Sequence, residues 1–467
     1  MITTQELLPQ LERVAAGVDA SKGLALASAT VEIEMVDPAA LVFASRRAAD
    51  RWFCWEQPDR DGLAIAALGS VRELVSRGDD RFTDLGEQWR RLLGRAAIET
   101  PEGAPPGAGP LLTGGFAFAP DGGAEAQWSS LPPALLVLPE VSLFRSDGRC
   151  FLTANTVFAG EAERDAALAA AGARVGSLRE SALEIEPADP HPTGEIRIDA
   201  PHSPGHYEGL VADGVGRISA GEFEKVVLAR EIRVQSHAAH DPATVFAALR
   251  ELFPSCFCFC CGTPEAAFVG ASPELLVRRN GAGAATVALA GTTGRSADPA
   301  VDDHLGERLL HSDKNRSEHR IVVERIERGL GRLSVWVQSA PEPGLIKVAN
   351  VQHLATPIRA QLADSHGAVE LAGLLHPTPA VGGEPSEAAV AAIAELEGMD
   401  RGWYSGPVGW VDSAEDGEFC VALRSGLIRD RTAHLYAGAG IVADSEPAAE
   451  LAETELKLGA MLPLVSA

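Results

Sequence analysis

The sequence lacks a long hydrophobic run, an excess of positive charge and an internal repeat. No apolar run among its 467 residues approaches the roughly 20 residues of a membrane-spanning helix. The net charge of −25 leaves no basic stripe that could neutralise phosphates, although a cationic cleft could still bind an anionic small molecule. The opening residues, MITTQELLPQLERVAAG, lack the basic segment and apolar core of a secretory signal. We therefore expect a soluble cytoplasmic protein with no nucleic-acid and no membrane partner.

Cysteine is also scarce, and four of the seven cysteines lie in one stretch, SCFCFCCG. Its alternation places Cys256, Cys258 and Cys260 on one face of an expected strand, with Phe257 and Phe259 on the other. Zinc sites require roughly two to four residues between paired ligands and a second pair elsewhere in the chain. The stretch therefore predicts a buried strand whose thiols pack as small apolar groups, and no metal centre.

The order of helical and strand-like segments predicts the α+β class, with large antiparallel sheets flanked by helices. Strand-like runs are interrupted by helices without the regular alternation that a parallel sheet requires. Helical patterns cover residues 161–185, 206–221, 240–253, about 302–330 and 385–396. A stretch rich in proline and histidine, 186–207, is either a domain linker or a long surface connection.

The segment EPAAELAETELKLGAML, near the C-terminus, carries charged residues at helical spacing. Glu450, Glu453 and Lys457 stand at positions i, i+3 and i+7, which places them on one face of a helix. Pro447 is typical of the first turn of such a helix. This face is either a solvated surface or a site that holds a cation and an anion, and the segment alone does not decide between them.

Glu318, in SDKNRSEHRIVVERI, offers a second carboxylate on a distant helical segment. Mg²⁺ is commonly held by one or two carboxylates together with substrate oxygens and water. Glu318 and Glu453 are compatible with such a pair, although their spacing in the sequence does not show that they meet.

Three further charged residues lie in apolar surroundings. Glu274 follows a proline at the start of an apolar run, where a desolvated carboxyl group suits a general acid; a strand-edge charge is the alternative. Lys225, at a strand start, is either a base or a lysine that extends to water. Arg424 lies among apolar residues of an expected strand, where an inward-facing arginine needs an anionic partner. The glycine-rich strings LAGTTGR and LYAGAGIV let backbone N–H groups approach a carboxylate, or form plain turns.

Ten strings taken in order resemble the chorismate-utilising enzymes, which include isochorismate, salicylate, anthranilate and aminodeoxychorismate synthases. They are KVVLAR, GASPELL, ALAGTTGR, KNRSEH, VQHLATPI, LLHPTPAVGGEP, DRGWYSGPVGW, FCVALRSGLI, LYAGAGIV and ELAETELKLG. The close match covers about residues 205–465, and the first part, 1–190, is similar to the more variable half of the same fold. The resemblance implies one domain over residues 1–467 with the fold of anthranilate synthase component I, and a monomer.

The resemblance also implies a Mg²⁺-dependent site for chorismate. Glu318 and Glu453 match the family's metal ligands, and Glu450 matches the neighbouring acid that contacts the hydration shell of the metal. The residues that match the family's substrate-binding positions are Gly291, Thr292, His353, Ala380, Tyr404, Arg424, Gly438 and Lys457.

Lys225 and Glu274 match the family's base and acid for addition of water, so the resemblance implies isochorismate as the product. Lys225 would take a proton from the water that attacks ring carbon 2, and Glu274 would protonate the departing hydroxyl on carbon 4. Ala380 and Val381 match the place linked to stopping at isochorismate, although some relatives carry leucine where Val381 stands.

Two alternatives to an isochorismate synthase stay open, and one departure from the family pattern bears on the metal. A salicylate synthase would go on to eliminate pyruvate. A non-catalytic binding relative would be expected to lose Lys225 or Glu274, and both are present. Asn315 stands where some relatives have an acidic residue near the metal, which changes the expected charge there.

Overall fold

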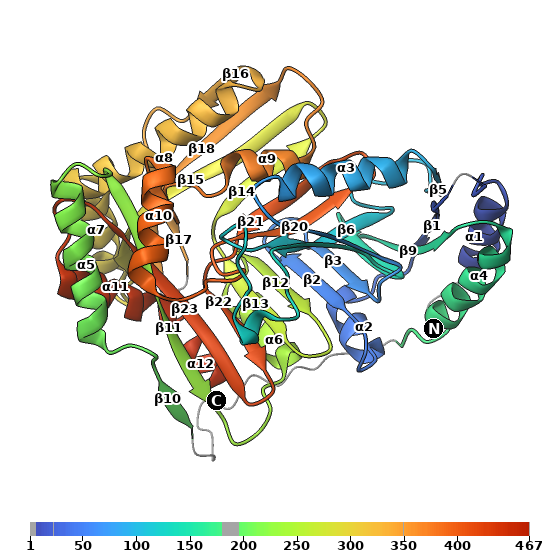
Figure 1. The fold of residues 1–467 in the computed structure, drawn as a ribbon, viewed down its shortest axis with the longest axis horizontal. Helices are drawn as coiled ribbons and strands as arrows, with labels where there is room; N and C mark the ends of the chain where they lie inside the picture. The colour runs from blue at the N-terminus through green and yellow to red at the C-terminus, as the bar shows by residue number, and fades with distance from the viewer. Residues whose placement is uncertain (1–5, 22, 180–195, 349, 467) are drawn as a thin grey trace.

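Two large sheets and the helices around them form the fold (Figure 1). The computed structural model describes residues 6–21, 23–179, 196–348 and 350–466. Strands β1 and β5 pair in parallel, whereas all other strand pairs within these residues are antiparallel. The expected α+β class with large antiparallel sheets is confirmed. None of the helices in these ranges is both long and apolar enough to cross a membrane.

The first sheet holds 13 strands of the described residues, and the second holds 10. The first sheet has the order β10 (Arg197–Asp199), β11 (Lys225–Gln235), β23 (Thr432–Ile441), β22 (Ser425–Arg429), β13 (Ala267–Ser272), β12 (Phe257–Gly262), β2 (Trp52–Gln57), β3 (Leu63–Leu68), β8 (Val141–Ser146), β9 (Arg149–Phe158), β1 (Ala25–Ile33) and β5 (Ala96–Glu99), with β19 (Gly383–Glu384) beside β11. The second sheet has the order β16 (Ser334–Ser339), β18 (Val351–Leu362), β15 (Gly283–Gly294), β14 (Leu275–Asn280), β21 (Gly417–Val421), β20 (Pro407–Asp412), β6 (Leu111–Phe116), β7 (Ala134–Leu138) and β4 (Arg72–Ser76), with β17 (Gly344–Lys347) beside β18.

Three apolar clusters hold the layers together. The first lies between one face of the first sheet and the helices α1 (Leu7–Ala16), α2 (Pro38–Ser45), α4 (Glu161–Val175), α6 (Pro242–Leu252) and α12 (Leu462–Val465). The second joins the second sheet and strands β11 and β23 to the helices α3 (Arg81–Leu93), α5 (Pro204–Ser219), α8 (Asp313–Gly331), α9 (Ala368–Leu375) and α10 (Ser386–Glu397). The third is rich in aromatic rings and fills the space between the two sheets. The remaining helices are η1 (Ala126–Trp128), α7 (Pro299–Leu310) and α11 (Pro447–Leu458).

The cysteine-rich stretch forms β12 with the alternation that its period of two predicts. Cys256, Cys258 and Cys260 pack in the first cluster, whereas Phe257 and Phe259 pack in the third, between the sheets. All seven cysteines are buried and free. The thiols thus fill space beneath α6 as small apolar groups.

The predicted helix over about 302–330 is wrong in one respect, because the segment forms two helices. Helix α7 ends at Leu310 and α8 begins at Asp313. Ser312 has extended backbone angles and its hydroxyl accepts a hydrogen bond from the backbone N–H of Asn315, so it caps α8. The new helix start places Glu318 in the second turn of α8.

The expected seam at 186–207 lies partly outside the described residues, which resume at residue 196. Strands from both sides of the seam pair with each other: β2 pairs with β12 in the first sheet, and β6 pairs with β20 in the second. In Figure 1 the helices α5, α10 and α11 gather beside β11 and β23, at the opposite end of the molecule from α1 and α4. The candidate site lies at the end of the molecule that holds α5, α10 and α11.

Candidate active site

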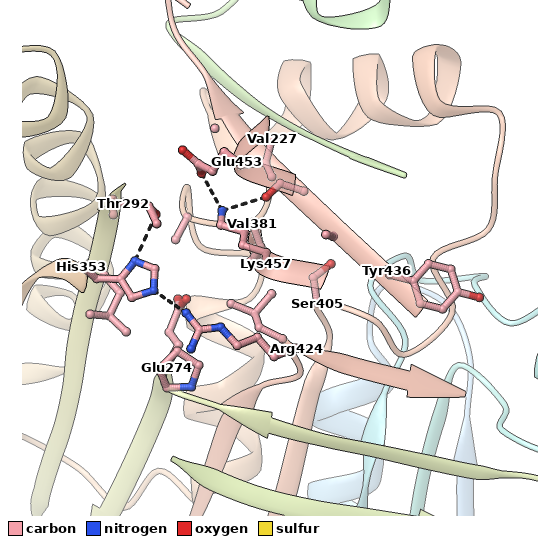
Figure 2. A pocket seen from close by; sticks show the side chains of 18 of the residues that line it. Val227, Glu274, Thr292, His353, Val381, Ser405, Arg424, Tyr436, Glu453 and Lys457 are labelled. Carbon is pink, nitrogen blue, oxygen red and sulfur yellow. Dashed lines mark hydrogen bonds and ion pairs between the residues drawn. The ribbon is translucent and has the colours of Figure 1, made fainter. Parts of the chain in front are cut away.

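A cleft of about 770 Å³ brings together most of the residues that the sequence proposes for a site. Its walls come from β11, β15, β18, β23, α8 and α11, and from the loops that carry Val381, Tyr404 and Arg424. Figure 2 shows side chains from these elements gathered around one space. The proposed site residues that line the cleft are Glu274, Gly291, Thr292, Glu318, His353, Ala380, Tyr404, Arg424, Gly438, Glu453 and Lys457. Lys225 and Glu450 do not line it: Lys225 contacts the lining residue Glu318, whereas Glu450 contacts Lys314, which is not a lining residue.

Glu274 is a buried carboxyl group in the cleft wall. It lies directly before β14 and is 4% exposed. Its backbone N–H donates to the hydroxyl of Ser272, and the hydroxyl of Thr378 donates to its Oε1 at 3.5 Å. Burial raises its pKa to about 8, against the opposing effect of the Lys225 charge. At neutral pH the group therefore holds a proton that it can donate into the cleft.

Lys225 begins β11 and is fully buried. Its Nζ lies 2.8 Å from Oε1 of Glu318, which lines the cleft from α8. A side chain at Gly440 would collide with that carboxylate and come within 3.1 Å of Cε of Lys225. Gly440 thus leaves the room in which Lys225 and Glu318 meet.

Thr292, His353 and Arg424 form a chain of hydrogen bonds along one wall (Figure 2). Nη2 of Arg424 lies 2.6 Å from Nε2 of His353, and Nδ1 of His353 lies 3.1 Å from Oγ1 of Thr292. Burial, followed by the charges of Arg424 and Lys457, lowers the pKa of His353 well below its ordinary value. Since a guanidinium only donates, the neutral imidazole accepts at Nε2 and carries its proton on Nδ1.

Arg424 presents an unpaired donor to the cleft. Its Nη1 is buried and has no hydrogen-bond partner among the described residues, and burial lowers the pKa of its guanidinium. The prediction that it lies on a strand is wrong: it stands between β21 and β22 with a φ of 48°. There the chain leaves the second sheet and enters the first, so the arginine lies where the two sheets diverge. A buried cation with an unused donor fits an anionic ligand.

Helix α11 supplies the opposite wall, and its predicted start at Pro447 is confirmed. Nζ of Lys457 lies 2.7 Å from Oε1 of Glu453 and donates to the backbone O of Gly438 at 2.8 Å. Tyr404 is buried beside this wall and stacks on Tyr436, with ring centroids 5.3 Å apart.

Gly291 allows an irregularity in β15, where this strand faces α8. It has a φ of 76° and stands at an irregularity in the pairing of β15 with β18. A Cβ there would lie 3.0 Å from the side chain of Asn315. Glycine therefore allows the strand to bend against α8 beside Thr292.

The three carboxylates proposed for a metal each contact a different lysine. Glu318 pairs with Lys225 and Glu453 with Lys457, whereas Glu450 turns to Lys314 at 2.8 Å. Burial raises the pKa of Glu453, and the charges of Glu318 and Glu450 raise it further. The charges of Glu318 and Glu450 therefore oppose ionisation of Glu453, whereas its contact with Lys457 favours it.

This donor set fits a hard divalent cation that is completed by other oxygens. Among the described residues, no group of three or more histidine, cysteine, aspartate or glutamate side chains is close enough to enclose a metal. Glu318 and Glu453 both line the cleft, and two carboxylates with substrate oxygens and water are a usual Mg²⁺ environment. Glu450 does not line the cleft and pairs with Lys314.

Arg401 and Ser405 line the cleft, and neither was among the residues predicted from the sequence to form the site. Arg401 is buried, pairs with Glu397 at 2.5 Å and donates to the backbone oxygens of Val381 and Val227 at 2.9 Å. It thus joins α10 to two walls of the cleft. The i, i+4 spacing of Glu397 and Arg401 is a signal for their ion pair, but no spacing rule links this pair to the backbone of Val381 and Val227.

Gly440 could have been inferred. It follows Gly438 by two residues on one strand, and residues two apart face the same side. The string LYAGAGIV thus already placed two glycines on the face that forms the cleft.

Comparison with known proteins places this cleft in a family. Residues 11–466 match the chorismate binding enzyme family. The chain is 40% identical over 444 residues to the salicylate biosynthesis isochorismate synthase of Pseudomonas aeruginosa, covering 95% of this chain and 90% of that one. It is 34% identical over 444 residues to isochorismate synthase MenF of Bacillus subtilis, covering 94% and 93%.

Solved structures agree. The menaquinone-specific isochorismate synthase MenF from Escherichia coli superposes with a TM-score of 0.79 at 27% identity, covering 99% of both chains. Anthranilate synthase component I from Streptococcus pneumoniae shares the fold, with a TM-score of 0.66 at 21% identity over 88% of this chain and 92% of that one. The chain belongs to the chorismate binding enzyme family.

Proposed function

We propose that this enzyme converts chorismate to isochorismate in the presence of Mg²⁺. The observation that carries the proposal is Glu274, a carboxyl group buried in the cleft that stays protonated at neutral pH. Lys225, whose charge acts on Glu274, lies behind the adjoining wall at Glu318. A buried acid in the cleft wall and a base directly behind the adjoining wall suit a reaction that removes a hydroxyl and adds another.

The reaction balances without any oxidant or reductant. Lys225, once its own proton has passed to solvent, takes a proton from the water that attacks ring carbon 2 of chorismate, while both ring double bonds shift. Glu274 protonates the hydroxyl on carbon 4, which leaves as water. One water enters and one departs, so the product is an isomer. A proton then returns from Lys225 to Glu274 through solvent, which restores both groups.

Cationic groups on two walls would hold the two carboxylates of chorismate. Nη1 of Arg424 is an unused buried donor, and Lys457 extends a second ammonium from α11. His353 holds the Arg424 guanidinium from the side. Ala380 and Val381 line the cleft as apolar residues, which offer no group that would assist further elimination.

Glu318 and Glu453 are the residues that would hold Mg²⁺. When bound, the metal would neutralise the ring carboxylate and stabilise the charge that develops as the hydroxyl departs. Glu450, held by Lys314 outside the cleft, would act on the hydration shell from a distance. The family resemblance also leads us to propose a cytoplasmic monomer, which light scattering and fractionation would test.

Product analysis tests this proposal directly. The purified protein is incubated with chorismate and Mg²⁺, with and without EDTA, and the products are separated by chromatography. We expect isochorismate that disappears with EDTA and is strongly reduced in the Glu274→Gln variant. Salicylate with pyruvate as the main product would replace the proposal with the salicylate synthase alternative. No turnover by a protein that binds chorismate would favour a non-catalytic relative.

A further inference from the structure

Lys314 is a cation placed among all three acidic residues of the proposed metal site. It lies in the first turn of α8, four residues before Glu318, so both side chains project from the same helix face. Its Nζ donates to Oε1 of Glu450 at 2.8 Å. Partial burial lowers the pKa of Lys314, but the hydrogen bond to Glu450 and the charges of Glu450, Glu318 and Glu453 raise it above the ordinary value.

The three carboxylates proposed for the metal are already balanced by lysines in this structure. Three carboxylates are matched by three ammonium groups, through the pairs Lys225–Glu318, Lys314–Glu450 and Lys457–Glu453. A divalent cation alone would add two positive charges to a neutral set. A divalent cation together with the two carboxylates of chorismate adds none.

Lys314 differs from the other two lysines in its exposure and in its distance from the proposed chemistry. Lys225 is 1% exposed and is the proposed base, and Lys457 lines the cleft as a proposed substrate anchor. Lys314 does not line the cleft, and its side chain is 35% exposed. It can therefore swing toward water without disturbing the residues that meet chorismate.

We propose that Lys314 is a tethered counter-ion that weakens the binding of a free divalent cation and so makes metal and substrate bind together. It acts as a positioning residue, because it holds Glu450 away from the cleft and offsets the negative charge that would attract the metal. The inference rests on the proposed function, which assigns Glu318 and Glu453 to Mg²⁺.

The physical reason is the charge of the site before substrate arrives. An ammonium group a few ångströms from a carboxylate opposes a second cation there, although solvent screens the effect at a partly exposed side chain. The dianionic substrate offsets that opposition. Coupling of this kind is reciprocal, so metal and chorismate raise each other's affinity by the same factor.

Metal binding without substrate tests the inference. Mn²⁺ is titrated into the wild-type protein and into Lys314→Met, and free Mn²⁺ is followed by electron paramagnetic resonance. We expect the variant to bind Mn²⁺ about tenfold more tightly, since one positive charge near the carboxylates has been removed. Lys314→Arg keeps the charge and should bind Mn²⁺ as weakly as the wild type.

Lys347 provides a matched control. Its side chain is 34% exposed and also pairs with carboxylates, those of Asp302 and Asp303, but none of the three lines the cleft. Lys347→Met should therefore leave Mn²⁺ affinity unchanged. Equal tightening in Lys347→Met and Lys314→Met would show a general loss of positive charge and would overturn the inference.

A second measurement addresses the coupling. In the Glu274→Gln background, which should bind chorismate with little turnover, we expect chorismate to tighten Mn²⁺ binding by a larger factor when Lys314 is present than when it is methionine. Unchanged or weaker Mn²⁺ binding by Lys314→Met overturns the inference while leaving the proposed reaction intact. If EDTA does not affect turnover and neither protein binds Mn²⁺, the metal assignment and this inference both fail.

Discussion

Nε2 of His353 accepts a hydrogen bond from Nη2 of Arg424 at 2.6 Å, so a neutral imidazole holds a buried guanidinium in place. Replacing His353 with leucine removes this acceptor and leaves Arg424 free to turn away from an anion. A hydrogen bond to a charged group contributes about 1.5–3 kcal/mol, so we expect KM for chorismate to rise roughly 10- to 100-fold with a smaller change in kcat. Steady-state kinetics at saturating Mg²⁺ measure both constants.

Thr292→Val is the matched control for this variant. It preserves the side-chain shape but removes the hydroxyl that lies 3.1 Å from Nδ1 of His353. Because His353 would keep its contact with Arg424, we expect only a small rise in KM. An unchanged KM in His353→Leu would mean that Arg424 does not need the imidazole to meet the substrate.

The second prediction concerns Glu274 as the proton donor. Its pKa of about 8 means that the protonated, active form is lost as the pH rises through that value. We expect kcat/KM of the wild type to fall about tenfold per pH unit above pH 8. Glu274→Gln should lower kcat by roughly 10²- to 10⁴-fold and abolish this dependence. A wild-type profile that keeps rising to pH 9 would contradict the assignment.

The buried acid also lowers stability in a pH-dependent way. The folded chain keeps the Glu274 proton to about pH 8, whereas the unfolded chain releases it near the ordinary value of 4.5. The folded state therefore binds the extra proton in this window, and the free energy of unfolding falls as pH rises. Each pH unit accounts for about 1.4 kcal/mol, so Glu274→Gln should gain about 3 kcal/mol over the wild type between pH 5 and pH 8.

Urea denaturation of both proteins at the two pH values measures this difference. Comparing the variant with the wild type at each pH cancels the titration of all other groups. A stability difference that does not change with pH would show that Glu274 ionises alike in both states.

The fold class and several elements follow from local patterns in the sequence. Pro447 and the helical spacing of Glu450, Glu453 and Lys457 predicted α11, and the alternation around Cys258 predicted β12. These predictions succeeded because periodicity and helix starts are set by neighbouring residues.

What the sequence did not predict depends on contacts between distant elements. It placed Arg424 inside a strand, although packing of two sheets against each other bends the chain there into a left-handed conformation. Helical spacing put Glu450 on the same face as Glu453, but it did not reveal that Glu450 pairs with Lys314 of another helix. Which lysine meets which carboxylate is decided by the packing of helices and strands, and spacing along one element carries no information about it.

The fourth prediction concerns the buried pair of Arg401 and Glu397, whose side chains are 3% and 1% exposed. Arg401→Met leaves the Glu397 carboxylate buried without its cation, which costs about 3–5 kcal/mol. The double variant Arg401→Met/Glu397→Gln removes the charge but keeps an acceptor for the backbone N–H of Ala229. We expect the double variant to recover part of the loss in urea denaturation. A double variant as unstable as the single one would show that the lost bonds to Val381 and Val227 dominate.

The last prediction concerns Glu453 as a metal ligand. Glu453→Gln keeps the size of the side chain and removes the charge that a hard cation requires. It also frees Lys457, which now contacts that carboxylate at 2.7 Å. We expect the Mg²⁺ concentration for half-maximal activity to rise at least about tenfold, since loss of a charged oxygen ligand weakens the metal site.

Glu455→Gln is the control for Glu453→Gln, because it lies on the same helix but its side chain is 61% exposed and faces Arg230 outside the cleft. It should leave the Mg²⁺ dependence as in the wild type. Since Lys457 is also a proposed substrate anchor, KM for chorismate is measured at saturating Mg²⁺ for both variants. If Glu453→Gln changes only this KM and not the Mg²⁺ requirement, Glu453 orients Lys457 and the metal must be held by other groups.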